Sequence, residues 1–179
     1  MIQITAGFQH ENVAIDATGF SRTNPSLHYI KRIDRVNPSK RFAKLSMLFS
    51  IDKRKVIAIK VRAKPRHDSK DIEPLLGSYC KMQCLLGDKA YDVEVLHKKC
   101  YLKGIQTIIP KKVNIRSGYY RKMQMKNFSE EKYHQRSLIE SGFSALKRKY
   151  GSSVSEKSLA SINSELSCKV LAHNLELKH

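Results

Sequence analysis

Residues 41–64, RFAKLSMLFSIDKRKVIAIKVRAK, constrain the fold more than any other stretch of the chain. Two runs rich in β-branched and large apolar residues flank the polar turn Asp52-Lys53-Arg54. This pattern predicts two antiparallel strands joined as a hairpin. The two-residue period of a strand divides the second run into two faces. One face carries Val56, Ala58, Lys60 and Arg62, and the other carries Ile57, Ile59, Val61 and Ala63.

The segments on either side of the hairpin predict an alternation of strands and helices. Ser69 and Asp92 are the expected N-caps of the first two helices, and Gly104 is the expected C-cap of the second. An antiparallel group followed by strand–helix alternation predicts an α/β fold, a mixed sheet flanked by helices. Besides the hairpin, we expect strands at 12–20, 82–88 and 105–112, helices at 69–80, 92–104, 133–149 and 155–177, and a long basic loop at 113–131.

Charge is the dominant feature of the composition. The 179 residues include 34 Lys and Arg against 16 Asp and Glu, for a net charge of +18. Such a field favours a polyanionic partner, most often nucleic acid. The basic residues are spread along the chain, which favours a broad phosphate-binding surface over a lipid-binding segment. In the basic segment 113–131 they alternate with Tyr119, Tyr120 and Phe128, a composition suited to nucleic-acid contact.

The sequence shows no sign of a membrane or secretory segment. It has no apolar run long enough to cross a bilayer, and its first residues lack the pattern of a signal peptide. We therefore expect a cytoplasmic protein with reduced thiols. Cys80, Cys84, His97 and Cys100 have a spacing that could bind zinc, but the segment between them predicts a strand, a turn and a helix start. The structural interpretation of these residues is favoured.

The predicted helix at 133–149 has two stripes. Its apolar seam, with a four-three-four spacing, is Ile139, Phe143, Leu146 and Tyr150. A second stripe carries Tyr133, Arg136, Glu140, Ser144 and Lys147. In the simpler interpretation, this stripe is a solvated face in which an Arg136–Glu140 pair contributes about 0.3 kcal/mol.

Three carboxylates occupy positions that can converge. Asp16 lies near the end of the first strand, Asp88 ends the strand at 82–88, and Glu140 lies on the helix at 133–149. Like charges that meet raise each other's pKa, and a divalent metal relieves that cost. Each aspartate could instead be a turn or cap residue. Asp92 competes with Asp88, which is favoured because it directly follows the buried strand.

At these residues the chain resembles the catalytic domain of DDE-type insertion-sequence transposases, of the IS-four and IS-five kind. AIDATGFSRTNPSLHYIKR is similar to the first-Asp block of that family, and LLGDKAYDVEVL to its second-Asp block. YHQRSLIESGFSALKRKYG fits the third block. There Tyr133, Arg136, Glu140 and Lys147 are separated by two, three and six residues, as the family's motif requires.

The resemblance implies a ribonuclease-H-like fold and a metal-dependent reaction on double-stranded DNA. It implies that Asp16, Asp88 and Glu140 hold two Mg²⁺ or Mn²⁺ ions. It also implies hydrolysis at a transposon end, followed by attack of the freed 3′-hydroxyl on target DNA. Tyr133, Arg136 and Lys147 would contact phosphates of the transposon end, and Lys89 is a weaker candidate for a DNA contact.

Two departures from the family pattern shape the expected domain organisation. Only 15 residues precede Asp16, too few for the helical DNA-binding domain that relatives carry, and the 51 residues between Asp88 and Glu140 leave no room for a large insertion. We expect one catalytic domain over residues 1–179, in the nucleoid-associated cytoplasm of a prokaryote, acting on DNA as a homodimer. The alternatives are a truncated chain that binds DNA without transposing it, a nuclease of the same fold, and a basic binding module without chemistry.

Overall fold

The computed structural model describes residues 2–3, 10–22, 42–64, 66–77, 81–115, 117–156 and 158–177. These residues form one seven-stranded mixed sheet, in which β1, β4, β3, β2, β5 and β6 are neighbours in that order and β7 pairs with β2. The strands are β1 (Ile2–Gln3), β2 (His10–Arg22), β3 (Phe42–Ser50), β4 (Lys55–Arg62), β5 (Met82–Gly87), β6 (Gln106–Ile108) and β7 (Ser153–Val154).

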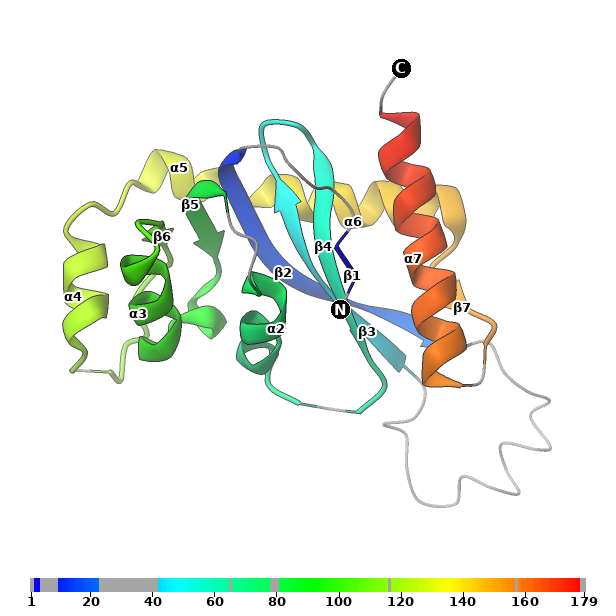
Figure 1. The fold of residues 1–179 in the computed structure, drawn as a ribbon, viewed down its shortest axis with the longest axis horizontal. Coiled ribbons are helices and arrows are strands. Elements are labelled where there is room, and N and C mark those ends of the chain that lie inside the picture. The colour runs from blue at the N-terminus through cyan, green and yellow to red at the C-terminus, as the bar shows by residue number, and fades with distance from the viewer. Residues whose placement is uncertain are drawn as a thin grey trace.

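Helices cover both faces of the sheet (Figure 1). α2 and α3 pack on one face, while α6 crosses the strands on the other face with α7 beside it. The helices are α2 (Ile72–Leu76), α3 (Glu94–Leu102), α4 (Tyr119–Met125), α5 (Glu130–His134), α6 (Ser137–Tyr150) and α7 (Leu159–Glu176), with short 3₁₀ helices η2 (Asp68–Asp71) and η3 (Lys89–Tyr91).

The sheet has the ribonuclease-H-like arrangement that the sequence predicts. β3 is antiparallel to both β2 and β4, whereas β2, β5 and β6 run parallel to one another. The hairpin of β3 and β4 turns at residues 51–54, as predicted. Among the described helices, none combines the length and the apolar character that crossing a bilayer requires.

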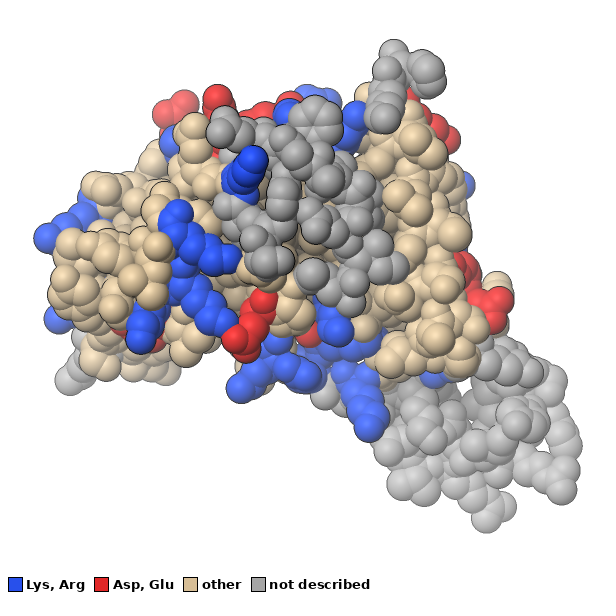
Figure 2. Space-filling view, in the orientation of Figure 1, with Lys and Arg blue, Asp and Glu red and all other residues tan. Residues whose placement is uncertain are grey.

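Basic side chains outnumber acidic ones on the face of the molecule that carries α2 and α3 (Figure 2). Figure 2 shows Lys and Arg side chains scattered over the face that carries α2 and α3, with fewer acidic ones.

The predicted alternation of β4 is wrong at Val56. The pairing of β3 with β4 shifts register, from Leu48 opposite Ala58 to Phe49 opposite Val56, so Ile57 is an extra residue in β4. Such a bulge reverses the faces of the residues beyond it. Val56 therefore packs with Ile59 on the α6 side, whereas Ile57 and Ala58 pack on the α2 side.

Several predicted elements have different bounds or types. The basic segment 113–131 is not a continuous loop, because it contains α4 and the start of α5. The predicted helix at 133–149 is broken between α5 and α6, and the final helix starts only at Leu159. Ser69 lies inside η2 and caps no helix, and the N-cap of α3 is Val93, not Asp92.

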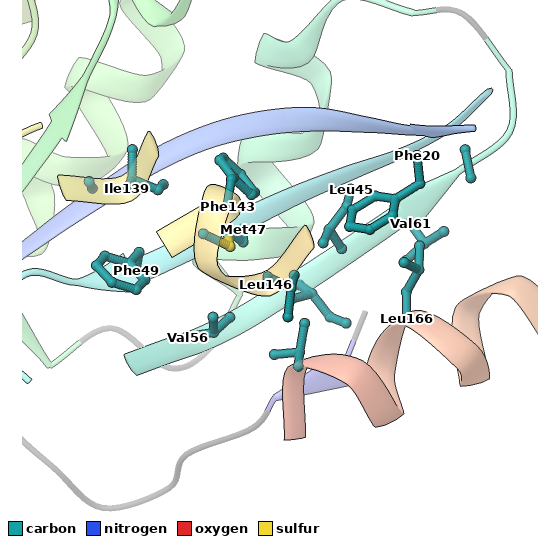
Figure 3. Packing of buried hydrophobic residues seen from close by; sticks show 14 of the residues in the cluster. Phe20, Leu45, Met47, Phe49, Val56, Val61, Ile139, Phe143, Leu146 and Leu166 are labelled. Carbon is teal, nitrogen blue, oxygen red and sulfur yellow. The ribbon is translucent and has the colours of Figure 1, made fainter. Parts of the chain in front are cut away.

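The seam of α6 confirms the predicted core face. Ile139, Phe143 and Leu146 are buried against the sheet, and Figure 3 shows them beside Met47 and Phe49 of β3. α7 extends the same core with Leu166, among other residues. This packing fixes which edge of α6 faces β2, and therefore where the polar stripe of α6 lies.

Gly142 allows α6 to approach β3 closely. A Cβ atom on Gly142 would lie 2.9 Å from Cε2 of Phe49. Helix propensity alone predicts that Gly142→Ala stabilises the protein by about 1 kcal/mol. We expect the opposite sign, a net loss of about 1 kcal/mol in the free energy of unfolding, because overpacking a dense core costs roughly 1–3 kcal/mol.

Urea unfolding of the Gly142→Ala variant tests this expectation. Ser144→Ala is the matched control, because Ser144 is exposed on the same helix and its substitution should change stability by no more than about 0.5 kcal/mol. If Gly142→Ala were more stable than the wild type, the close approach of α6 to Phe49 would be wrong.

Candidate active site

Asp16 and Asp88 occupy adjacent positions on two parallel strands. The last registered pair of β2 and β5 is Ile15 with Gly87, and the two aspartates come next in the chain. Asp16 lies in the middle of β2, not near its end as predicted, because β2 continues along β3 as far as Ser21. β5 stops at Gly87. The aspartates therefore lie where one strand ends beside the middle of its neighbour.

Local hydrogen bonds hold both aspartates. Oδ1 of Asp16 accepts a hydrogen bond from the backbone N–H of Ala17 at 2.8 Å. Asp88 is the N-cap of η3, and its Oδ1 accepts from the N–H of Ala90 at 2.8 Å. Both side chains are half-buried, so each carboxylate keeps a solvent-accessible edge.

Arg136 joins Asp16 to the third predicted carboxylate. Its Nη1 lies 3.5 Å from Oδ2 of Asp16, and its Nη2 donates to Oε1 of Glu140 at 2.8 Å. Glu140 is 58% exposed, whereas Asp16 is 22% exposed. The guanidinium thus lies between carboxylates that come from β2 and from α6. The ion pair between Arg136 and Glu140 that the simpler interpretation predicted is present. Arg136 also contacts Asp16 of the sheet, so the stripe is not only a solvated face.

The three carboxylates act on one another electrostatically. Burial raises the pKa of Asp16, and the negative charges of Asp88 and Glu140 raise it further. The hydrogen bond from Ala17 and the charge of Arg136 oppose this effect but do not reverse it. Asp16 therefore lies in a field that a nearby cation would relieve.

The carboxylates fit a divalent metal by donor type and by charge. Mg²⁺ and Mn²⁺ prefer carboxylate oxygens, and the Arg136 guanidinium already places positive charge between Asp16 and Glu140. In the described part of the chain, no three Asp, Glu, His or Cys side chains are grouped closely enough to hold a metal ion as they stand. Metal binding would therefore require Arg136 and the exposed Glu140 to rearrange.

The other predicted DNA-contacting residues lie around this site. Nζ of Lys147 donates to Oγ1 of Thr18 at 2.8 Å, and it lies 5.3 Å from the centre of the Phe20 ring. Arg136 and Lys147 thus follow the same strand, β2. The half-buried Tyr133 packs on the core, and its carbonyl accepts from the N–H of Arg136 at 3.0 Å. Lys89 is exposed in η3, directly after Asp88.

Asp92 belongs to a different, buried network. Its Oδ1 accepts from Nε of Arg121 at 2.5 Å and contacts Nε2 of His97 at 2.9 Å, while its Oδ2 accepts from the N–H of Lys112 at 2.8 Å. Nδ1 of His97 lies 2.8 Å from Oγ1 of Thr107. Asp92 is thus a structural residue, which removes it as a competitor of Asp88.

The same network argues against the alternative interpretation of Cys80, Cys84, His97 and Cys100 as a zinc site. His97 is buried with both ring nitrogens in hydrogen bonds, so neither is free to bind a metal. Cys80, the first residue of the pattern, lies outside the described residues.

Comparison with known proteins agrees with the fold. The family described as "Transposase DDE domain" matches residues 7–175. The chain therefore belongs to the DDE transposase family and carries its catalytic domain. A comparison with curated proteins found no match. Membership of this family implies a DNA substrate and an enzyme that cuts and joins DNA strands.

Proposed function

We propose that this chain cuts DNA at transposon ends and joins the freed ends to target DNA, with Asp16, Asp88 and Glu140 as its metal-holding carboxylates. One observation carries the proposal. A carboxylate of β2 and a carboxylate of α6 share Arg136, beside the position where Asp88 leaves β5. The spacing of Tyr133, Arg136, Glu140 and Lys147 supports a transposase of the IS-four or IS-five kind. We propose a single catalytic domain over residues 1–179.

Each reaction replaces one phosphodiester oxygen by another. In the first, water attacks phosphorus at the transposon end and the 3′ oxygen leaves as a hydroxyl. In the second, that 3′-hydroxyl attacks a target phosphodiester, so one P–O bond forms, another breaks and a target 3′-hydroxyl is released. When bound, two Mg²⁺ or Mn²⁺ ions would stabilise the charge on the attacking and leaving oxygens.

The chain's own residues would hold the DNA strand in place. Arg136 can move from the carboxylates to a phosphate, where a guanidinium makes two parallel hydrogen bonds. Lys147, anchored on Thr18, carries a positive charge two residues along β2 from Asp16. Tyr133 supports the turn that presents Arg136. Lys89 would contact DNA beside Asp88. We propose that two copies act together, because a transposon has two ends.

Arg136→Ala should strengthen Mn²⁺ binding by the DNA-free protein by about tenfold. The substitution removes a cation 3.5 Å or less from two carboxylate oxygens. A unit charge at such a distance contributes about 1–4 kcal/mol, depending on solvent exposure, and tenfold is about 1.4 kcal/mol. DNA affinity should fall in the same variant. Free Mn²⁺ measured by electron paramagnetic resonance during a titration gives the affinity.

Arg136→Lys is the matched control for this prediction, because it keeps the charge and should bind Mn²⁺ about as the wild type does. If Arg136→Ala bound Mn²⁺ no more tightly than Arg136→Lys, the guanidinium would not compete with metal for these carboxylates.

The proposed function is tested by incubating the protein with supercoiled plasmid at low salt, with Mn²⁺ or with EDTA. We expect nicked plasmid with Mn²⁺ only, and joined products when a duplex with a free 3′-hydroxyl at a transposon end is added. Nicking without joining would favour a nuclease of the same fold. DNA binding without nicking would contradict the proposal and favour a chain that only binds DNA.

A further inference from the structure

A hollow lined by basic residues lies at the edge of the sheet, and its lining includes none of Asp16, Asp88 and Glu140. It has a volume of about 330 Å³ and is lined by Lys111, Ser117, Arg121, Lys122, Met125 and Lys126. Its residues come from the segment after β6 and from α4, which lies at the end of the molecule beyond β6 (Figure 1). Except for Lys111, these residues belong to the basic segment 113–131 that the sequence suggested for nucleic-acid contact, and this segment contains α4.

The three lysines of this hollow carry charge that the described part of the chain does not neutralise. Lys111, Lys122 and Lys126 are all exposed. None of the ion pairs between described residues includes any of them. Three cations gathered around one concave surface repel one another, and an anion with several oxygens placed among them removes that repulsion.

The floor of the hollow is held rigidly. Arg121 is 4% exposed, and its charge is neutralised by Asp92 and Glu94. Its Nη1 also donates to the carbonyl of Ser117. Oε1 of Gln124 accepts from the N–H of Thr107 at 3.0 Å, which joins α4 to β6. α4 therefore presents Lys122, and Lys126 at its C-terminal end, from a fixed position, which limits the entropy lost on binding.

α5 connects the segment of the hollow to the candidate active site along the chain. α5 follows α4, packs on β5, and leads directly into Arg136. Lys132 lies in α5, with its Nζ 3.7 Å from Sγ of Cys84 in β5. β6 is two strands from β2, or roughly 10 Å. A duplex is longer than this separation, so we expect one duplex bound at Arg136 to extend to the edge of the sheet where α4 lies.

We propose that Lys111, Lys122 and Lys126 form a second binding site for backbone phosphates of duplex DNA, outside the reacting position. This inference rests on the proposed function in one respect, namely that the polyanion bound by these lysines is DNA. It concerns equilibrium binding, and it requires neither metal nor cleavage. The same chemistry could bind free inorganic phosphate, so the experiment separates the two sources.

The test measures the affinity for a fluorescent 30-base-pair duplex in EDTA, by anisotropy, over a range of salt concentrations. The variant carries Lys111→Gln, Lys122→Gln and Lys126→Gln. The matched control carries Lys64→Gln, Lys70→Gln and Lys81→Gln. These three lysines are exposed and do not line the hollow. Both variants lose three charges, so a uniform loss of attraction affects them equally. Thermal unfolding checks that both remain folded.

The logarithm of the affinity falls linearly with the logarithm of the salt concentration, and each lost phosphate contact makes this fall less steep by about 0.9. We therefore expect the slope for the variant of Lys111, Lys122 and Lys126 to become less steep by about 2 to 3, and that for the control by less than about 1. Equal slopes for the two variants would overturn the proposal. A second result would also overturn it. In that case the variant of Lys111, Lys122 and Lys126 would lose its binding of inorganic phosphate, measured by calorimetry, while the salt dependence of its DNA binding stayed unchanged. Because no cleavage is measured, failure of the proposed chemistry would not change the result.

Discussion

Asp16→Asn is expected to lower Mn²⁺-dependent nicking of plasmid DNA by about a thousandfold, or about 4 kcal/mol of transition-state stabilisation. Asparagine keeps the shape of the side chain and can still accept the hydrogen bond from Ala17 N–H. It removes the charge that would hold a divalent cation. DNA binding should be unchanged or stronger, because one negative charge beside the phosphates is lost.

Glu140→Gln should show the same separation of cleavage from binding. Glu131→Gln is the matched control, since Glu131 is an exposed carboxylate on neighbouring α5 and should retain wild-type nicking. The reaction is followed as the initial rate of nicked plasmid on agarose gels, and binding is followed by anisotropy. If Asp16→Asn nicked DNA at the wild-type rate, the carboxylate site would be misplaced.

Asp92→Ala is expected to lower the free energy of unfolding by about 3–5 kcal/mol, the cost of leaving a buried charge without its partner. Asp92 is fully buried and accepts hydrogen bonds from Arg121 and from Lys112 N–H. Its removal leaves the buried guanidinium of Arg121 with Glu94 as its carboxylate partner, at 3.7 Å. Because Arg121 fixes α4, the same substitution should also weaken DNA binding through Lys122 and Lys126.

Urea unfolding measures this loss. Glu73→Ala is the matched control, because Glu73 also pairs with a basic residue, Lys99, but is 77% exposed. An exposed ion pair contributes at most about 1 kcal/mol. If Asp92→Ala cost no more than Glu73→Ala, the buried network would not stabilise the fold.

The same network gives the protein an acid-sensitive stability. Burial would raise the pKa of Asp92, but the hydrogen bonds from Lys112 N–H, Arg121 and His97 together lower it. Burial lowers the pKa of His97 from its ordinary value of about 6.5, and this effect is larger than the increase that Asp92 causes. Both groups therefore bind protons more readily in the unfolded chain. Their stabilisation is present at neutral pH and is lost as the pH falls, for His97 below about 6.5. Asp92→Ala should remove the part of this loss that comes from Asp92, whereas the part from His97 should remain, because burial still lowers the pKa of His97.

Much of the fold could be predicted because local pattern and global arrangement agree. The β3–β4 hairpin has apolar runs and a polar turn, so its topology followed from the sequence. Asp16 and Asp88 are adjacent because each follows a buried segment on parallel strands. The bulge at Ile57 could not be predicted, since the register of two strands depends on their mutual packing and not on either strand alone.

α4 escaped prediction for a different reason. Its buried face carries Arg121 and Gln124 instead of an apolar seam, so hydrophobic periodicity gave no signal. The helix exists because distant residues, Asp92 and Thr107, satisfy those polar groups. The break between α5 and α6 lacks a Gly or Pro signal too. There the N–H groups of Arg136 and Ile139 bond three residues back, which tightens the chain into a 3₁₀-like turn.

The candidate site was predictable in its residues but not in its contacts. The helical spacing of Arg136 and Glu140 indicated their pair, because residues four apart share a face. The contact of Arg136 with Asp16 joins positions 120 residues apart and depends on how α6 packs on the sheet. The link from Lys147 to Thr18 depends on the same packing.

The most direct test of the central claim measures Mn²⁺ bound to the protein–DNA complex by electron paramagnetic resonance. The wild type is compared with a variant carrying Asp16→Asn, Asp88→Asn and Glu140→Gln. We predict that the wild-type complex binds two ions per chain and that the variant, while still binding DNA, loses both. Equal Mn²⁺ binding by the two complexes would contradict the assignment of these three carboxylates as the metal site.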